Sequence, residues 1–187
     1  MTPQHLPHDW YPEPLPPNVT VGERSWVYSS FAFSHFRSEA EPAVQIGSDS
    51  GVYHTCFFEL GPRGSVSIGN FCAIVGAKIA CDCAVVIEDY AFIAHDVVIA
   101  DTHFAVPPQR SAVSRPEPPE QPVIRIGRNA WIGARAVVLL GADVGEGAIV
   151  GAGTIVDFPV PPFSIVAGDP AHIVGSCRQP EDRIDGG

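Results

Sequence analysis

Hydrophobic positions recur every six residues through the second half of the chain. From Ile126 to Val156, every sixth residue is aliphatic. Four places after each of the first five of these positions the chain has a small residue, namely Ala130, Ala136, Ala142, Ala148 and Thr154. Residues two apart in a strand point to the same face, so the small and the large residue of each repeat share one side. The period predicts short strands wound into a three-sided prism, with one repeat on each side and a core that alternates large and small residues.

The same phase appears earlier in the chain, with more irregularity. Its aliphatic and aromatic positions are Val21, Val27 and Phe33, then Ile46 and Val52, Ile68 and Ile74, and Ile87, Ile93 and Ile99. Ile68 and Ile87 are 19 residues apart, one more than three repeats, which predicts a bulge or a small excursion near Ala80–Ala84. A β-sandwich with regular strands is the alternative, but it does not explain an unbroken six-residue period. The expected fold is therefore an all-β parallel β-helix.

Glycine follows the aliphatic residue in several repeats, at Gly127, Gly133, Gly145 and Gly151. We expect these glycines at the bends between prism faces, where a positive φ costs glycine little.

Proline-rich stretches interrupt the repeat and predict the domain boundaries. Residues 103–123 contain six prolines and no hexad phase. Because proline cannot donate to a strand ladder, we expect this stretch to leave the wall as a protruding Pro-rich loop. Residues 1–20 are expected to form a Pro-rich N-terminal extension, 21–175 the β-helix domain and 176–187 a polar C-terminal tail. The three prolines within 159–162 are expected to stop the coil.

Charge and composition exclude several function classes. The formal net charge is −10 and Lys78 is the single lysine, so the basic face of a nucleic-acid-binding protein is missing. No uncharged run approaches the length of a membrane helix, and the N-terminus lacks the basic start and apolar stretch of a signal peptide, which makes the cytoplasm the default compartment. Five scattered cysteines, with Cys81 and Cys83 as the only close pair, predict free thiols.

Several motifs carry a resemblance to a known family. They are Trp131-Ile132-Gly133, Gly151-Ala152-Gly153, Pro161-Pro162 and Ala167-Gly168-Asp169-Pro170. Together they resemble the hexapeptide-repeat acyltransferases, most closely the maltose- and galactoside-type sugar O-acetyltransferases. The resemblance implies a left-handed β-helix, a homotrimer, and acetyl-CoA as co-substrate in the groove between neighbouring prisms. It also implies that an acetyl group is transferred to a hydroxyl of a saccharide or a similar small molecule.

The resemblance assigns roles to particular residues. His103, at the base of the loop, matches the family's general base, with Asp101 nearby to hold its imidazole. Asp82 lies near the position of an acceptor-binding aspartate, and His95 is a candidate for lining the same groove. The residues expected to contact CoA are Trp131, Gly133, Ala134, Gly151, Ala152 and Arg178.

The sequence also departs from the family pattern. Asp157-Phe158 replaces a Thr-Lys pair that contacts CoA, and Arg178 is the candidate to compensate for the lost charge. Because CoA carries phosphate groups, an aspartate there should weaken donor binding.

Three alternatives remain open from the sequence. The chain could be a non-catalytic β-helix scaffold or an N-acyltransferase. A γ-type carbonic anhydrase shares the fold but holds a metal with three histidines. His95 and His103 are eight residues apart and the second lies on the loop, so no metal site is predicted.

Overall fold

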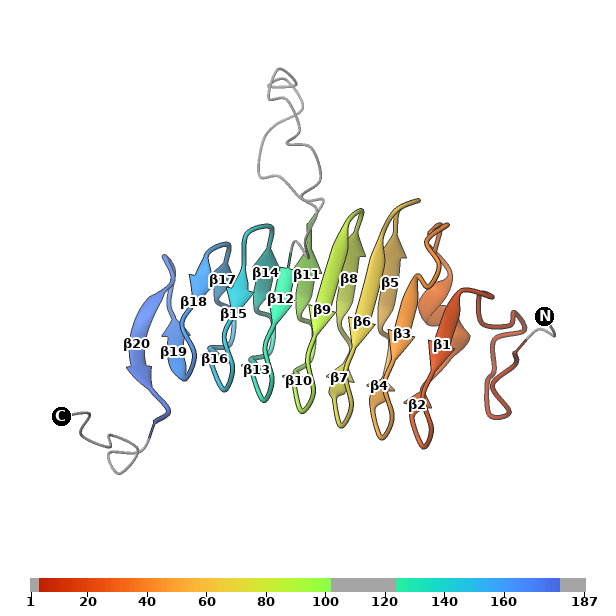
Figure 1. The fold of residues 1–187 in the computed structure, drawn as a ribbon, viewed down its shortest axis with the longest axis horizontal. Helices are drawn as coiled ribbons and strands as arrows, with labels where there is room; N and C mark the ends of the chain where they lie inside the picture. The colour runs from red at the N-terminus through yellow and green to blue at the C-terminus, as the bar shows by residue number, and fades with distance from the viewer. Residues whose placement is uncertain (1–3, 102–123, 179–187) are drawn as a thin grey trace, which may run out of the picture.

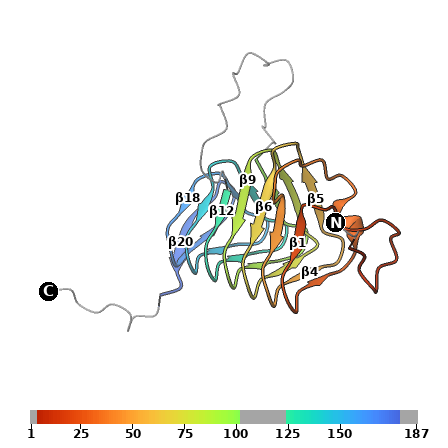
Figure 2. The same ribbon diagram turned by 45° about the vertical axis from the view of Figure 1, so that its right-hand side comes forward.

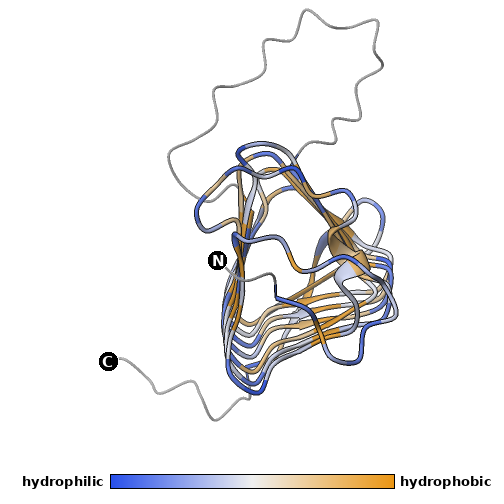
Figure 3. Ribbon diagram, turned by 90° about the vertical axis from the view of Figure 1, so that its right-hand side faces the viewer, coloured by the Kyte–Doolittle hydropathy of each residue, from blue (hydrophilic) through white to orange (hydrophobic). Residues whose placement is uncertain are grey.

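The computed structural model describes residues 4–101 and 124–178. It is an all-β structure, a left-handed parallel β-helix whose three sheets form the walls of a triangular prism (Figures 1 and 3). The coils lie one above another along the prism axis (Figure 2). The expected fold class is confirmed. His103, the loop 103–123 and residues 179–187 lie outside the described residues.

Each complete coil between the first and the last adds one strand to each wall, and all neighbouring strands but one pair are parallel. Wall 1 contains β1 (Val19–Val21), β3 (Val44–Ile46), β6 (Ser65–Ile68), β9 (Ala84–Ile87), β12 (Ile124–Ile126), β15 (Asp143–Val144) and β18 (Pro159–Val160). Wall 2 contains β2 (Trp26–Val27), β4 (Gly51–Tyr53), β7 (Ala73–Val75), β10 (Phe92–Ile93), β13 (Trp131–Ile132), β16 (Ile149–Val150), β19 (Ser164–Ala167) and β20 (His172–Ser176). Wall 3 contains β5 (Phe57–Leu60), β8 (Lys78–Cys81), β11 (Val98–Ala100), β14 (Val137–Leu139) and β17 (Ile155–Val156).

The hexad phase predicts both the register and the core. Ile87 pairs with Ile126, and Ile126 with Val144, so equivalent repeat positions lie directly above one another. The six aliphatic positions from Ile126 to Val156 are completely buried, and so are the small residues between them. The core is therefore a continuous column of stacked side chains inside the prism, as the alternation of large and small residues predicts.

The glycines after the aliphatic residues have a different role from the one expected. Gly127, Gly133, Gly145 and Gly151 are not among the residues with positive φ. A Cβ on Gly127 would instead lie 2.8 Å from the backbone nitrogen of Glu146 in the next coil, and one on Gly133 would lie 2.6 Å from that of Ala152. At Gly127, Gly133 and Gly145 adjacent coils approach each other too closely for a side chain, whereas a Cβ on Gly151 would make only a tight contact of 3.1 Å with the Cβ of Ala167.

Positive φ occurs mainly at non-glycine residues of the turns, such as Asn129 and Arg135. Asn129 and Arg135 lie two positions after Gly127 and Gly133. The positive φ of the turn and the close approach of adjacent coils are therefore requirements on different residues.

The prolines at 159–162 do not stop the coil, contrary to the expectation. Val160 pairs with Val144, and Val166 pairs with Val150, so the stack continues through β18 and β19. Pro159 is tolerated because β18 is the last strand of wall 1 and pairs only with β15. β20 then turns back and pairs antiparallel with β19.

The extra residue expected near Ala80–Ala84 lies in the turn between β8 and β9. β8 ends at Cys81 and β9 begins at Ala84, and Asp82 and Cys83 form the turn between them. Both strands keep a regular register with their neighbours, so the extra residue forms a small excursion at the edge and not a β-bulge. This turn lies on the edge between walls 3 and 1, which is also the edge where the chain leaves for residues 102–123 (Figure 1).

The first coil replaces its third strand with the 3-10 helix η1 (Ser30–Phe33). The Phe33 ring stacks on Phe58 of β5 at 4.9 Å, so the helix continues the core column by aromatic contact. All five cysteines are free thiols, as expected. In the described segments no helical stretch has the length and apolar character that a membrane crossing requires.

The residues before β1 pack against this first coil. Leu15 is buried in the core, and His8 stacks on the Trp26 ring at 3.8 Å. The Asp9 carboxylate accepts hydrogen bonds from the Ser29 and Ser30 hydroxyls at 2.7 and 2.6 Å. Burial would raise the pKa of Asp9, but these bonds, with those from the backbone N–H groups of Ser30 and Tyr11, lower it to about 2.

We expect Asp9→Asn to lower the free energy of unfolding at neutral pH by about 1 kcal/mol, since it weakens hydrogen bonds to a charged acceptor. A carboxyl whose folded pKa is depressed stabilises the fold above its unfolded pKa of 3.8 and loses that contribution as the pH falls toward 2. The difference between wild type and variant should therefore shrink over that range. Urea unfolding at several pH values measures it. Asp96→Asn, at an exposed aspartate, is the control for the substitution itself.

Candidate functional site

Trp131 stands on the outer face of wall 2 because β13 alternates outward and inward side chains. Its neighbour Ile132 points into the core and is completely buried, whereas Trp131 is 52% exposed. The Phe92 ring, one coil earlier in the same register position, meets Trp131 edge-on with centroids 5.8 Å apart. An exposed indole and phenyl pair on a rigid wall offers a flat apolar surface to a ligand.

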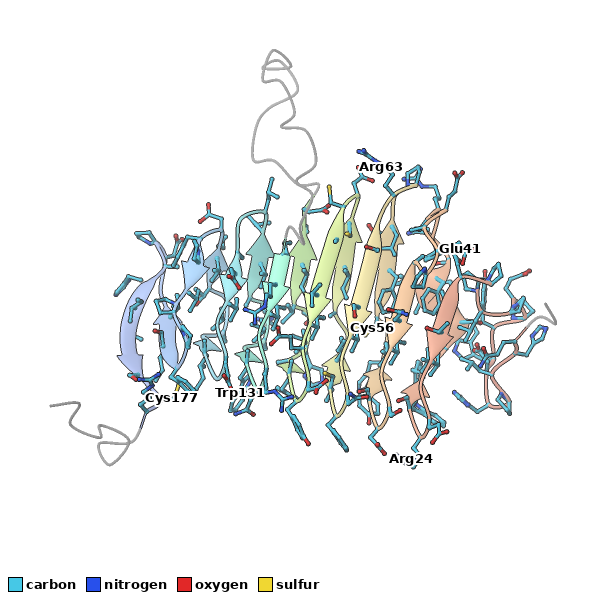
Figure 4. The ribbon with its side chains drawn as sticks, in the orientation of Figure 1. Arg24, Glu41, Cys56, Arg63, Trp131 and Cys177 are labelled. Atoms are coloured by element: carbon cyan, nitrogen blue, oxygen red, sulfur yellow. The ribbon has the colours of Figure 1, made fainter. Side chains whose placement is uncertain are left out.

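A groove runs over this surface along the edge between walls 1 and 2. It is lined by Tyr90, Phe92, Asn129, Ala130, Trp131, Gly147, Ile149 and Cys177. Cys177 follows β20, and its backbone N–H donates to the carbonyl of Phe163 at 2.8 Å, which fixes the C-terminal segment beside the groove. Trp131 and Cys177 lie on the same edge of the prism, opposite Arg63 (Figure 4).

Two guanidinium groups lie near this groove. Arg128 lies over the Tyr90 ring at 5.7 Å from its centroid. Arg178 lies over the Phe163 ring at 4.7 Å and follows the groove residue Cys177. Both are positioned by aromatic rings of the turns. Arg128 also forms an ion pair with Asp89 at 3.1 Å, which neutralises part of its charge, so Arg178 is the stronger source of positive charge beside this apolar surface.

The sequence prediction missed Tyr90, Phe92 and Arg128. Phe92 could have been found from the hexad register, because it occupies the position of Trp131 one coil earlier. Tyr90 and Arg128 lie in the turns, where the repeat sets no residue type.

Ala134, Ala152 and His95 lie together on the next edge, between walls 2 and 3. The backbone N–H of Arg135 donates to the His95 carbonyl at 2.9 Å, and that of Gly153 donates to the Ala134 carbonyl at 2.9 Å. The three residues therefore occupy the same turn on consecutive coils, with Gly133 and Gly151 just before it. The His95 ring lies 5.7 Å from the His54 ring, two coils earlier.

Asp82 and Asp101 lie on the third edge, between walls 3 and 1. Asp101 is 6% exposed, and its carboxylate accepts the backbone N–H groups of Asp82 and Cys83, both at 2.8 Å. The Cys81 thiol lies 3.3 Å from the same carboxylate. Burial raises the pKa of Cys81, and the charge of Asp101 raises it further, so the thiol stays protonated and can donate.

The expected site residues therefore fall on different edges of one prism. Most of the residues expected to contact CoA lie on wall 2 and its two edges, whereas Asp82 and Asp101 lie on the edge between walls 3 and 1, together with Asp157. His103 is outside the described residues. Among residues 4–101 and 124–178, no three His, Cys, Asp or Glu side chains gather closely enough to hold a metal ion.

Comparison with known proteins points to one family. The family model described as "Hexapeptide repeat of succinyl-transferase" matches residues 123–157. Galactoside O-acetyltransferase of Escherichia coli is 32% identical over 170 residues, which cover 88% of this chain and 66% of that protein. The chain thus spans just under two thirds of this relative's length.

Solved structures share the fold. The hexapeptide-repeat acetyltransferase of Vibrio cholerae, in complex with acetyl-CoA, aligns with a TM-score of 0.59 and 23% identity over 80% of this chain and 76% of that chain. A mutant of an N-acyltransferase from Bacillus cereus, in complex with dTDP and coenzyme A, aligns with a TM-score of 0.57 and 18% identity over 88% of this chain and 83% of that chain.

Proposed function

We propose, from the premise that this chain belongs to the hexapeptide-repeat acyltransferase family, that it transfers an acetyl group from acetyl-CoA to a hydroxyl of a saccharide or a similar small molecule. The observation that carries the proposal is the groove over Trp131, an apolar surface with guanidinium groups beside it. Such a surface suits the long, partly apolar pantetheine arm and the phosphate groups of CoA. The similarity to galactoside O-acetyltransferase supports a saccharide acceptor.

The proposed reaction is a direct transfer in a ternary complex. His103 accepts the proton of the acceptor hydroxyl as its oxygen attacks the thioester carbonyl. The C–S bond then breaks, and the CoA thiolate leaves and takes up a proton. Ala134 has no side-chain donor, so a backbone N–H group is the proposed stabiliser of the oxyanion.

We propose a homotrimer as the working form. In one chain Trp131, Ala134 and Ala152 lie on wall 2 or at its edge, whereas Asp82, Asp101 and Asp157 lie on the edge between walls 3 and 1. A complete site therefore requires that the edge between walls 3 and 1 of one prism meet wall 2 of a neighbour. Three equal prisms around a threefold axis make three such contacts, so every such edge and every such wall has a partner. Light scattering tests this arrangement, and a monomer at micromolar concentration would contradict both the trimer and the shared site.

The function is tested by CoA release from acetyl-CoA with methyl galactoside, maltose or glucosamine as acceptor. Turnover with the first two supports O-acetylation. Turnover with glucosamine, with the acetyl group found on nitrogen, would assign the chain to the N-acyltransferases instead. Binding of acetyl-CoA without turnover of any acceptor would contradict the proposed reaction with these sugars, and failure to bind acetyl-CoA would contradict the donor as well.

A charge reversal at Asp157 should strengthen donor binding. Asp157 is exposed at the end of β17, in a position where the family resemblance places a CoA contact. We expect Asp157→Lys to lower the KM for acetyl-CoA about three- to tenfold at low ionic strength, because it replaces repulsion of the CoA phosphates by attraction. Steady-state kinetics measure the effect.

Two controls separate charge from other causes. Asp157→Asn should give a smaller change, and added salt should reduce both changes. Acetyl-pantetheine, which lacks the phosphate groups, should bind wild type and variant equally. An equal gain with acetyl-pantetheine would show that the effect does not arise from phosphate attraction.

A further inference from the structure

The turn that carries Asp82 is held by one buried carboxylate. Asp101 accepts both backbone N–H groups of the turn, from Asp82 on one oxygen and from Cys83 on the other, each at 2.8 Å. The Cys81 thiol lies 3.3 Å from the second oxygen. Burying a carboxylate is costly unless its oxygens are hydrogen-bonded, and bonds to a charged acceptor are stronger than neutral ones. Asp101 therefore fixes the backbone on which Asp82 stands.

The Asp82 side chain itself lies against Gly61 in the equivalent turn of the preceding coil. A Cβ built on Gly61 would lie 1.6 Å from Oδ1 of Asp82 and 2.8 Å from its Cγ. Gly61 is not among the glycines with positive φ, so its backbone does not require glycine. The glycine instead provides the space that the Asp82 carboxylate occupies.

We propose that Asp101 and Gly61 are positioning residues for acceptor recognition, which hold the Asp82 carboxylate in place on the edge between walls 3 and 1. Asp101 sets the turn from the core side, and Gly61 leaves the side chain room from the neighbouring coil. This inference rests on the proposed function, in which Asp82 binds a hydroxyl group of the acceptor.

The turn that carries Asp82 is short and is closed by hydrogen bonds to Asp101. β8 and β9 are separated by Asp82 and Cys83 alone, and both backbone N–H groups of these residues point to Asp101. Asp101 itself is the last residue before the chain leaves for residues 102–123. One carboxylate thus connects the acceptor-binding turn to the point where that segment begins.

Gly61→Ala is the most direct test, because it displaces the Asp82 carboxylate without changing Asp82 or Asp101. The atom that must move is the end of a flexible side chain, so the fold should remain intact. We expect the KM for methyl galactoside to rise about tenfold or more, because the acceptor loses a hydrogen bond to a charged group. The kcat and the KM for acetyl-CoA should stay within about twofold of the wild-type values. The variant loses an interaction that the acceptor makes equally in the ground state and in the transition state, so the chemical step is unchanged.

A double-mutant cycle shows whether Gly61 acts through Asp82. In an Asp82→Ala background, Gly61→Ala should have no further effect on the acceptor KM, because the displaced group is absent. Asp101→Asn should raise the acceptor KM in the same direction, since its amide nitrogen cannot accept one of the two N–H groups. Gly175→Ala is the matched control, because a Cβ there makes only ordinary contacts, the nearest at 3.6 Å.

The outcomes separate this inference from the proposed function. If wild type acetylates methyl galactoside and Gly61→Ala has an unchanged acceptor KM, the positioning role is wrong while the function stands. If Gly61→Ala raises the KM equally with and without Asp82, the effect is a general disturbance of the coil and the inference is also wrong. If wild type turns over no acceptor but unfolds and assembles normally, the proposed function is what fails.

Discussion

Replacing His103 with alanine is expected to reduce kcat by roughly 10²–10⁴-fold, the usual contribution of a general base. An acceptor hydroxyl is a poor nucleophile at neutral pH, and removal of its proton during attack lowers the barrier. His103→Ala should leave assembly and acetyl-CoA binding nearly unchanged, because the imidazole acts on the acceptor. Steady-state kinetics beside a CoA-binding measurement test both parts.

His95→Ala is the matched histidine control and should cost much less. His95 lies on the edge between walls 2 and 3, beside His54. His103 comes two residues after Asp101 in the sequence, and Asp101 lies on the edge between walls 3 and 1. Near wild-type turnover in His103→Ala would exclude His103 as the base. A large loss in His95→Ala alone would move the base to that edge.

The second large effect is expected for Gly127→Ala, which should destabilise the fold by about 3 kcal/mol. The added Cβ would lie 2.8 Å from both the backbone nitrogen of Glu146 and the carbonyl oxygen of Val144. These are backbone atoms of the next coil, so no flexible side chain can move aside, and overpacking of this kind costs about 1–3 kcal/mol. The free energy of unfolding in urea, measured with Gly175→Ala beside it, tests the size of the effect.

A loss for Gly127→Ala no greater than for Gly175→Ala would show that the coils can separate locally. The explanation of these glycines by close approach of the backbone would then be wrong.

The periodic part of the structure could be predicted from the sequence, because one physical requirement repeats in every coil. Each inward position must fill the same narrow prism, so Ile126, Ile132 and their equivalents reveal the walls, the register and the core. The turns are less predictable. Their left-handed residues include Arg135 and Asn129, and no single residue type marks such a position.

The prolines at 159–162 show a second limit. Proline is excluded from a strand only where its backbone nitrogen would have to donate a hydrogen bond to a neighbouring strand. The last strand of a wall has a neighbour on one side alone, so it can accept a proline. The sequence did not reveal that β18 is that strand, since this follows from the number of coils. Phe158 shows a related effect, because it packs partly buried against the core in a position where the resemblance suggested a CoA contact.

For the candidate site, the sequence predicted the motif residues and missed their partners. Trp131 could be identified from its motif, whereas Tyr90 and Phe92 belong to the preceding coil and become neighbours only through stacking. Asp101 was expected near a histidine. Among the described residues its carboxylate instead contacts the backbone N–H groups of Asp82 and Cys83, 19 and 18 residues earlier in the chain, and the Cys81 thiol.

The stacking of coils also has a consequence for how the chain folds. Ile126 and its partner Val144 are 18 residues apart, whereas Ile87 and its partner Ile126 are 39 apart because residues 102–123 lie between them. Loop closure over the longer distance costs about 0.7 kcal/mol more conformational entropy. In a linear array each unit is stabilised only by its neighbours, so this junction is the slowest one to form by propagation. The coils before Asp101 and those after Ile124 can then grow as two separate nuclei, with the β9–β12 pairing as the step that joins them.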